Sequence, residues 1–110
     1  MIIVTNTYVR PSVNVPFFAM PQQLKSEFAQ AYRFTGLAIS TTSVLSEDQL
    51  TTTVTTKWAT RAAFNQFLDD PMSESMRTLR SMYAEANNIQ SSSDIKYIPT
   101  EGDMDAVPTV

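Results

Sequence analysis

The sequence predicts an α+β fold in which helices cover one face of a four-stranded antiparallel sheet. One observation is the strict alternation of side chains over residues 50–58, because a period of two with β-branched residues is typical of a strand. A second is the change to helical spacing directly afterwards. A third is the order of the predicted elements: strand, helix, strand, strand, helix, helix, strand. One side of the strand carries Leu50, Thr52, Val54, Thr56 and Trp58, and the helical stripe consists of Ala63, Phe64, Phe67 and Leu68.

The first strand is predicted over residues 1–9, which alternate in the same way. Residues 10–20 are expected to be irregular, because Pro11 and Pro16 interrupt both helices and central strands. This irregular segment is nevertheless apolar, so it must cover something. Phe17 and Phe18 cover either the protein's own core, or a partner, or the mouth of a pocket as a lid.

A helix is predicted from Pro21 to about Phe34, because proline suits a first helical turn and Gly36 stands at the usual C′ position. Residues 37–45 alternate again and form the second strand, which a turn at 46–48 joins to the third as a hairpin. The helical stripe is Leu24, Phe28, Ala31 and Tyr32, with Lys25, Glu27, Gln30 and Arg33 facing mostly outward.

Two further helices and a last strand follow the third strand. Thr60 is placed to cap the first of these helices, which should end at Asp69-Asp70-Pro71 because a residue before proline avoids the α region. The next helix runs from Met72 to about Asn88, and Asn87-Asn88 with the serines at 91–93 break it. Residues 94–99 form a short fourth strand. The apolar stripe of the last helix is Met72, Met76, Leu79, Met82 or Tyr83, and Ala86.

The composition restricts the classes of function. A chain of 110 residues forms one domain, here residues 1–99, followed by an acidic tail over 100–110. The net charge is −3, and without the three acids of the tail eight acids balance eight bases. No basic patch for nucleic acid, no membrane-spanning segment and no signal peptide is recognisable, so we expect a soluble cytoplasmic protein.

The residue types that carry much enzyme chemistry are missing. The chain has no cysteine and no histidine, which removes thiolate chemistry, disulfides, the commonest general base and the commonest metal ligand. Two glycines cannot build a phosphate-binding loop. The acidic pairs Glu47-Asp48 and Asp69-Asp70 stand at a turn and a helix end, where carboxylates are usually only solvated. We therefore expect neither a metal site nor a cofactor.

The predicted order is the βαββαβ ferredoxin-like plan with its second helix in two pieces. The segment from Trp58 to Phe67, WATRAAFNQF, resembles the W-x-S/T-x-x-A-F-x-x-[FW] signature of the dimeric α+β barrels, and more closely the antibiotic biosynthesis monooxygenase group. The resemblance covers roughly residues 1–98. It implies a homodimer, and pairing of the uncovered sheet face with a second copy would provide the missing cover.

What the resemblance implies for function must be taken residue by residue. Asn6 matches, within one residue, a first-strand Asn that several members use near substrate, and Trp58 matches the signature Trp, which is often structural. Haem-degrading members have a ring-distorting Trp where this chain has Phe67, and an axial His near Arg77. A guanidinium cannot ligate iron, so haem degradation is not expected. The segment over 11–20 also departs from the direct strand-to-helix link of the family.

The candidate site is a space between the sheet and the helices. A set of apolar side chains with one or two polar groups is typical of a small-molecule site, but equally of a core. Asn6, Tyr8 and Trp58 are the candidates for a catalytic role. The whole candidate ligand-binding set is Asn6, Tyr8, Phe28, Tyr32, Trp58, Phe67, Met72 and Met76.

Three functions are compatible with this set. The first is a homodimer that binds a small apolar molecule, lipid-like or aromatic, with Asn6 or Tyr8 at its polar end. The second is a cofactor-independent monooxygenase of a phenol or quinol, with Asn6 and Trp58 holding the oxygens. Without histidine only Tyr8, Tyr32 or a carboxylate of raised pKa could deprotonate such a substrate, so binding is preferred. The third is an interaction subunit without a ligand.

Overall fold

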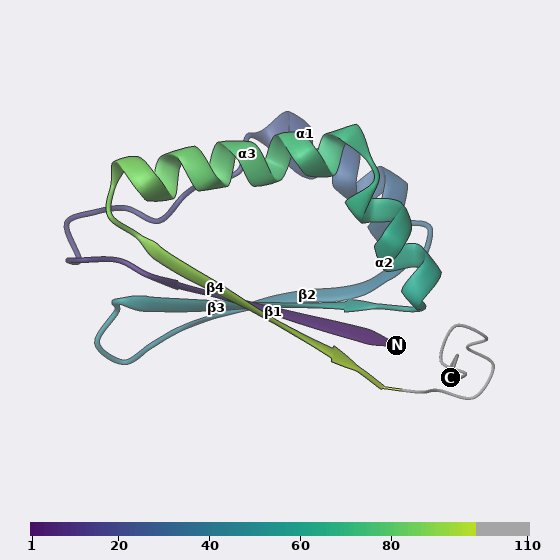
Figure 1. Ribbon diagram of the computed structural model, residues 1–110, viewed down its shortest axis with the longest axis horizontal. Coiled ribbons are helices and arrows are strands. Elements are labelled where there is room, and N and C mark those ends of the chain that lie inside the picture. The colour runs from purple at the N-terminus through teal and green to yellow at the C-terminus, as the bar shows by residue number, and fades with distance from the viewer. Residues whose placement is uncertain (99–110) are drawn as a thin grey trace.

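The computed structural model describes residues 1–98, which form a four-stranded antiparallel sheet with helices on one face (Figure 1). The strand order is β2-β3-β1-β4. This architecture confirms the α+β, ferredoxin-like fold. The elements are β1 (Ile2–Val9), α1 (Gln22–Phe28), the π-helical turn η1 (Ala29–Arg33), β2 (Ala38–Leu45), β3 (Thr51–Trp58), α2 (Arg61–Leu68), α3 (Pro71–Ala86) and β4 (Gln90–Tyr97).

Hydrogen bonds cap the starts of α2 and α3, where the sequence predicted that helices would begin. Thr60 Oγ1 accepts a bond from the Ala63 amide at 3.0 Å, which satisfies one free N–H of the first turn of α2. Helix α2 ends at Leu68, and Asp70 Oδ1 accepts from the Met72 amide at 2.9 Å to cap α3. The two helices are therefore separated by an acidic cap followed by a proline.

The fourth strand was predicted too short. It begins at Gln90 rather than Asp94, and the serines expected to break the chain lie within it. Ser91, Ser92 and Ser93 pair with Tyr8, Thr7 and Asn6 of β1. Backbone pairing to β1 therefore extends the strand, although the exposed serine side chains have little β propensity of their own. Pro99 and the predicted acidic tail lie outside the described residues.

The first helix covers the predicted range, but its last turn is wider than an α-helical turn. The amide of Phe34 donates to the carbonyl of Ala29 at 2.8 Å, which is the i to i+5 bond of a π-helix. Gly36 follows with φ +80°, as expected for a residue that ends a helix in the left-handed region. In α3 the predicted stripe is only partly buried: Leu79 and Ala86 are exposed, and of the alternatives Met82 and Tyr83, Met82 is exposed and Tyr83 is half-buried.

The strand alternation divides the sheet into two different faces. The face toward the helices carries Val4, Asn6 and Tyr8 of β1 and the even-numbered residues 52–58 of β3. The opposite face carries rows of threonines, such as Thr42, Thr55 and Thr5 across β2, β3 and β1. Figure 1 shows no helix over this second face.

The core lies at the Trp58 end of the helix-covered face. Trp58 and Tyr32 are the largest fully buried side chains, with ring centres 5.6 Å apart in a T-shaped arrangement. Phe67 lies 5.0 Å from Trp58 and Phe28 lies 6.0 Å from it. The edge-to-face contacts of Trp58 with Tyr32 and Phe28, and its tilted contact with Phe67, add to the hydrophobic burial of each ring. In the part of the chain that the structure describes, no helix is both long and apolar enough to cross a lipid bilayer.

Candidate functional site

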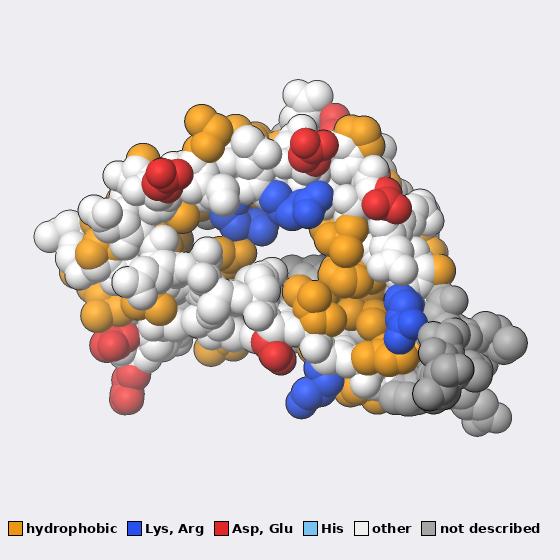
Figure 2. All heavy atoms as spheres, in the orientation of Figure 1, with side chains coloured by type: hydrophobic (Ala, Val, Ile, Leu, Met, Phe, Trp, Pro, Cys, Tyr) orange, Lys and Arg blue, Asp and Glu red, His pale blue; other side chains and the backbone are white. Residues whose placement is uncertain are grey.

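A cavity of about 680 Å³ lies between the helices and the sheet, next to the aromatic core. Figure 2 shows the hollow between α3 and the sheet, with basic side chains along its upper rim and hydrophobic side chains beside it. Interiors are normally packed with few voids larger than a water molecule, so this space is not ordinary core packing. The lining residues are Val4, Asn6, Tyr8, Phe17, Phe18, Met20, Lys25, Phe28, Ala29, Arg33, Thr41, Ser43, Thr52, Val54, Thr56, Trp58, Phe64, Phe67, Met76, Arg80, Tyr83, Ala84 and Ile89.

One end of the cavity is apolar and is built on Trp58. The helix of the Trp58–Phe67 segment lays Phe64 and Phe67 against the Trp58 ring, at 5.8 Å and 5.0 Å between ring centres. Phe28 from α1 meets Phe67 edge-on at 5.5 Å, and Met76 from α3 also borders the space. These side chains form a wall suited to the faces of a flat or aliphatic molecule.

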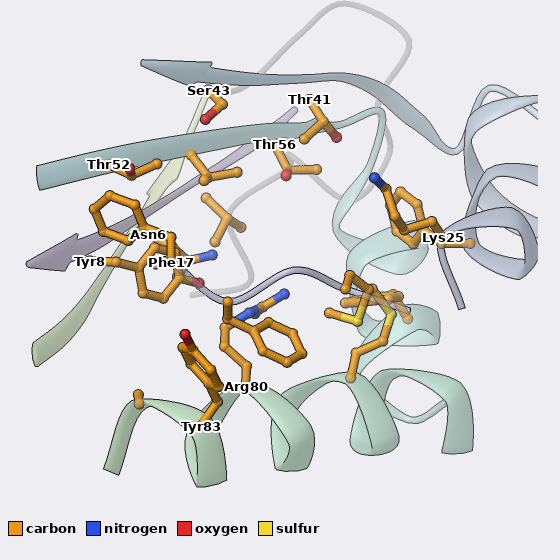
Figure 3. A pocket seen from close by; sticks show the side chains of 18 of the residues that line it. Asn6, Tyr8, Phe17, Lys25, Thr41, Ser43, Thr52, Thr56, Arg80 and Tyr83 are labelled. Atoms are coloured by element: carbon orange, nitrogen blue, oxygen red, sulfur yellow. The ribbon is translucent and has the colours of Figure 1, made fainter. Parts of the chain in front are cut away.

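The other end is polar and is built on the second half of β1. Asn6 and Tyr8 reach the cavity from the same face of β1, and Arg80 reaches it from α3 (Figure 3). The Arg80 guanidinium carbon lies 5.8 Å from the centre of the Tyr8 ring. The Asn6 amide oxygen accepts a short hydrogen bond from the Ser93 hydroxyl, which directs the amide from β4.

Tyr8 keeps its proton at neutral pH. Burial raises the pKa of the Tyr8 hydroxyl above its ordinary value, and the charge and hydrogen bonding of Arg80 only partly oppose this effect. A phenol whose pKa is raised donates a hydrogen bond but is a poor general base. Tyr8 is thus equipped to bind an acceptor rather than to remove a proton.

The charged groups around the cavity are all basic. Lys25 of α1, Arg33 of η1 and Arg80 of α3 line it, and no aspartate or glutamate does so within residues 1–98. Lys25 and Arg33 are solvent-exposed, as predicted, yet they border the cavity, because both lie on the side of their helix that faces the sheet. The sequence analysis did not select Arg80. This residue stands one helical turn after Met76 and one turn before Ala84, which also line the cavity.

The irregular segment after β1 forms one wall of the cavity. Phe17 and Phe18 are half-buried and line it. The Arg10 guanidinium lies 4.4 Å above the Phe17 ring and donates to the Val15 carbonyl at 3.1 Å. From the opposite side, the Tyr83 hydroxyl donates to the Pro16 carbonyl. Phe17 and Phe18 therefore line the pocket, and a role as a lid stays a prediction.

Six of the eight candidate residues meet at this cavity: Asn6, Tyr8, Phe28, Trp58, Phe67 and Met76. Tyr32 does not, because its ring is enclosed in the core and its hydroxyl donates to Asp70 Oδ2 at 2.6 Å. Met72 is packed against the core at the start of α3 and does not line the cavity either. A ligand-binding role for the six remains a prediction.

The acidic pairs have structural partners. Asp48 Oδ1 accepts hydrogen bonds from the Ser46 hydroxyl and the Leu50 amide, and these bonds lower the pKa of Asp48. Asp70 joins the Tyr32 hydroxyl to the first turn of α3. Both arrangements stabilise a turn or a helix end rather than form a reaction centre.

Solved structures share this fold over nearly the whole chain. A putative antibiotic biosynthesis monooxygenase from Deinococcus radiodurans superposes with a TM-score of 0.61 at 17% identity, covering 94% of this chain and 98% of its own. The chain has the fold of the antibiotic biosynthesis monooxygenase-like proteins. The expectation from the Trp58–Phe67 signature is thereby confirmed for the fold.

Two further structures agree. SnoaB, a cofactor-independent oxygenase from Streptomyces nogalater, here the mutant N63A, matches with a TM-score of 0.56 at 16% identity, over 93% of this chain and 97% of its own. Rv0793 from Mycobacterium tuberculosis matches with a TM-score of 0.59 at 12% identity, over 94% and 100%. The sequence matches no model of a known protein family, and no curated protein sequence matches it.

Proposed function

We propose that the protein is a homodimer in which each chain binds a small apolar molecule, aromatic or lipid-like, in the cavity between sheet and helices. The observation that carries this proposal is the cavity itself, whose volume of about 680 Å³ falls within the range of small-molecule sites. Its aromatic wall and its few polar groups at one end are the composition expected of such a site. Asn6 and Tyr8 are the proposed anchors for the polar end of the ligand.

The first test is native mass spectrometry of the purified protein, followed by denaturation and identification of any released molecule. Bound mass in a stoichiometry of one per chain supports the proposal and reveals the class of ligand. If the protein is purified without a bound molecule, 1-aminoanthracene serves as a general fluorescent probe of the apolar cavity. We expect saturable binding with one site per chain.

A pair of variants on α3 makes this test specific. Ala84 lines the cavity, whereas Ala86 is exposed two residues further along the same helix and does not line it. Ala84→Trp should fill the space and abolish probe binding, and Ala86→Trp should leave it unchanged. Equal binding by both variants would place the probe outside the cavity and contradict the proposal.

The dimer is proposed to form through the open face of the sheet. This face carries Val44, which is 65% exposed, among threonines of the neighbouring strands, and no helix covers it in Figure 1. Light scattering should give a mass of twice 12.3 kDa. Thr53→Arg places a charge at the centre of the face and should produce monomers, whereas Thr78→Arg on the exposed side of α3 should not. A mass near 12.3 kDa for the unaltered chain contradicts the dimer.

A cofactor-independent monooxygenase is the second candidate. It gains support from Asn6 and Trp58, which line one cavity, and from the oxygenase SnoaB, which has the same fold. Deprotonation of the substrate is its weak step, because the pKa of Tyr8 is raised and no carboxylate lines the described cavity. Oxygen uptake is measured with a panel of hydroquinones, with anaerobic controls. Uptake above background that is reduced in Asn6→Ala would establish an enzyme. If no oxygen is taken up, binding remains the function. The interaction-subunit alternative gains no support from the open cavity.

A further inference from the structure

The basic side chains of the cavity lack acidic partners. Lys25, Arg33 and Arg80 come from α1, η1 and α3, and within residues 1–98 none of them pairs with a carboxylate. Lys25 and Arg33 are exposed and therefore solvated, whereas Arg80 is half-buried. The charge of Arg80 is less well compensated, because the wall offers no opposite charge and limits access of water. A ligand that brings a negative charge would remove this deficit.

Arg80 is the cation placed most directly for this purpose. It is half-buried, and Figure 3 shows its side chain extending from α3 into the space below Asn6 and Tyr8. Its described side-chain neighbour is the Tyr8 ring, at 5.8 Å from the guanidinium carbon. Because Tyr8 stays protonated at neutral pH, it does not neutralise the guanidinium.

The remaining polar groups at this end offer donors. The Asn6 amide oxygen is occupied by the Ser93 hydroxyl, which leaves the amide NH₂ group as the part that can serve a ligand. The Tyr8 hydroxyl and those N–H groups of Arg80 that do not bond to Tyr8 add further donors. A set of donors beside a cation matches an oxygen that carries negative charge, since charge-assisted hydrogen bonds are the strongest that such groups make.

We infer that the ligand is an amphipathic anion, with an oxygen-borne charge held by Arg80, Asn6 and Tyr8 and an apolar body lying toward Trp58 and Phe67. This inference rests on the proposed binding function and names its ligand class: a carboxylate, or an ionised phenol or enol, on a flat or aliphatic body. Thr52 and Trp58 are six residues apart on one face of β3, so the two ends of the site are about 20 Å apart along the strand. That length accommodates both parts of such a molecule.

The test compares each anion with a neutral molecule of the same shape. The carboxylate pair is anthracene-2-carboxylate and anthracene-2-carboxamide, and the phenol pair is 7-hydroxycoumarin and 7-methoxycoumarin, all followed by fluorescence. For the phenol, the absorbance of the bound form also gives its ionisation midpoint. This midpoint should fall on binding, because the charged groups that line the cavity within residues 1–98, Lys25, Arg33 and Arg80, are all basic.

Arg80→Gln is the decisive variant. We expect at least one anion to bind ten-fold or more tightly than its neutral partner, and Arg80→Gln to remove this preference while it changes binding of the neutral partner less than three-fold. Arg80→Lys should retain part of the preference. Arg77→Gln is the matched control, because it removes one positive charge from an exposed position of the same helix that does not line the cavity, and it should leave the preference unchanged.

The possible outcomes distinguish a failure of the anion inference from a failure of the proposed binding function. Equal or tighter binding of both neutral partners overturns the anion inference and leaves the cavity-binding function standing. A preference that survives Arg80→Gln, or that falls equally in Arg77→Gln, also overturns it, because the charge would then act from elsewhere. If no member of either pair binds and 1-aminoanthracene does not bind either, the proposed function itself fails.

Discussion

The two ends of the helix-covered face of the sheet differ in how completely they are filled. At one end, Trp58 is in contact with the rings of Tyr32, Phe28 and Phe67, and almost no surface remains accessible. At the other end, Thr52 and its neighbours lie beneath a cavity of about 680 Å³. Both ends are built on the same strand, β3, and on the same series of alternating residues.

The size of the side chains, rather than the backbone, accounts for this difference. On the inward face of β3 the residues are Thr52, Val54, Thr56 and then Trp58, so one large ring follows three small side chains. Helix α3 spans both ends, and above the small side chains it contributes Arg80, Tyr83 and the small Ala84. A filled core and a binding cavity can thus share one strand pairing.

The largest expected effect comes from emptying the filled end. Trp58→Ala should lower the free energy of unfolding by about 3–5 kcal/mol, because it removes a fully buried ring and leaves a void among four other rings. Tyr8→Ala, at the hollow end, should cost substantially less, since its ring already borders open space. Chemical denaturation followed by circular dichroism measures both. Similar losses of unfolding free energy in the two variants would show that the two ends are equally packed in solution, which would contradict the difference described above.

The next effect comes from adding volume at each end. Ala63 is buried against the core, so Ala63→Leu should cost about 1–3 kcal/mol through overpacking. Val54 borders the cavity, so Val54→Leu should cost less than about 1 kcal/mol, because the added methylene enters open space. The same substitution should weaken probe binding. A large cost for Val54→Leu would mean that the cavity closes in solution.

The sequence predicted the filled end well because its signals are local. The alternation up to Trp58, the Thr60 cap and the stop at Asp69-Asp70-Pro71 each depend on neighbours a few residues away. The start of β4 depends instead on pairing with β1, a strand more than 80 residues earlier, so its serines gave no local sign of a strand. The π-helical turn likewise has no distinct local pattern.

The hollow end was predicted only in part, for a physical reason. Asn6 was selected because asparagine is uncommon in strands, and Tyr8 shares its strand face; both line the cavity. Lys25, Arg33 and Arg80 were not, because a basic residue in an amphipathic helix normally faces solvent. Their common cavity becomes visible only when α1, η1 and α3 are brought together over the sheet. Nor does a sequence reveal empty volume.

A smaller effect is expected at the hydrogen bond that joins the core to α3. Tyr32→Phe removes the 2.6 Å bond from the Tyr32 hydroxyl to Asp70 and should cost about 1 kcal/mol near neutral pH, since Asp70 is partly solvated. This bond first, and the Met72 amide second, hold the pKa of Asp70 below its ordinary value of 3.8. The ionised carboxylate therefore stabilises the fold above pH 3.8, and this contribution is lost as the pH falls through the lowered pKa.

The pH dependence distinguishes this bond from simple packing. The difference in unfolding free energy between the unaltered chain and Tyr32→Phe should be constant near neutral pH and should shrink below about pH 3.8. Urea denaturation at a series of pH values measures it. A difference that stays constant down to low pH would assign the cost to the aromatic core rather than to Asp70.

The smallest effect concerns the cap that holds α2 over the filled end. Thr60→Ala removes the acceptor for the Ala63 amide and should cost about 1 kcal/mol, whereas Thr60→Ser keeps the hydroxyl and should cost only a few tenths. Because α2 places Phe64 and Phe67 against Trp58, loosening its first turn should disturb the aromatic wall before it disturbs Arg80. Binding of 1-aminoanthracene should weaken while the preference for an anion over its neutral partner is kept. Loss of that preference in Thr60→Ala would show that the two ends of the cavity are coupled through α2 and α3 rather than independent.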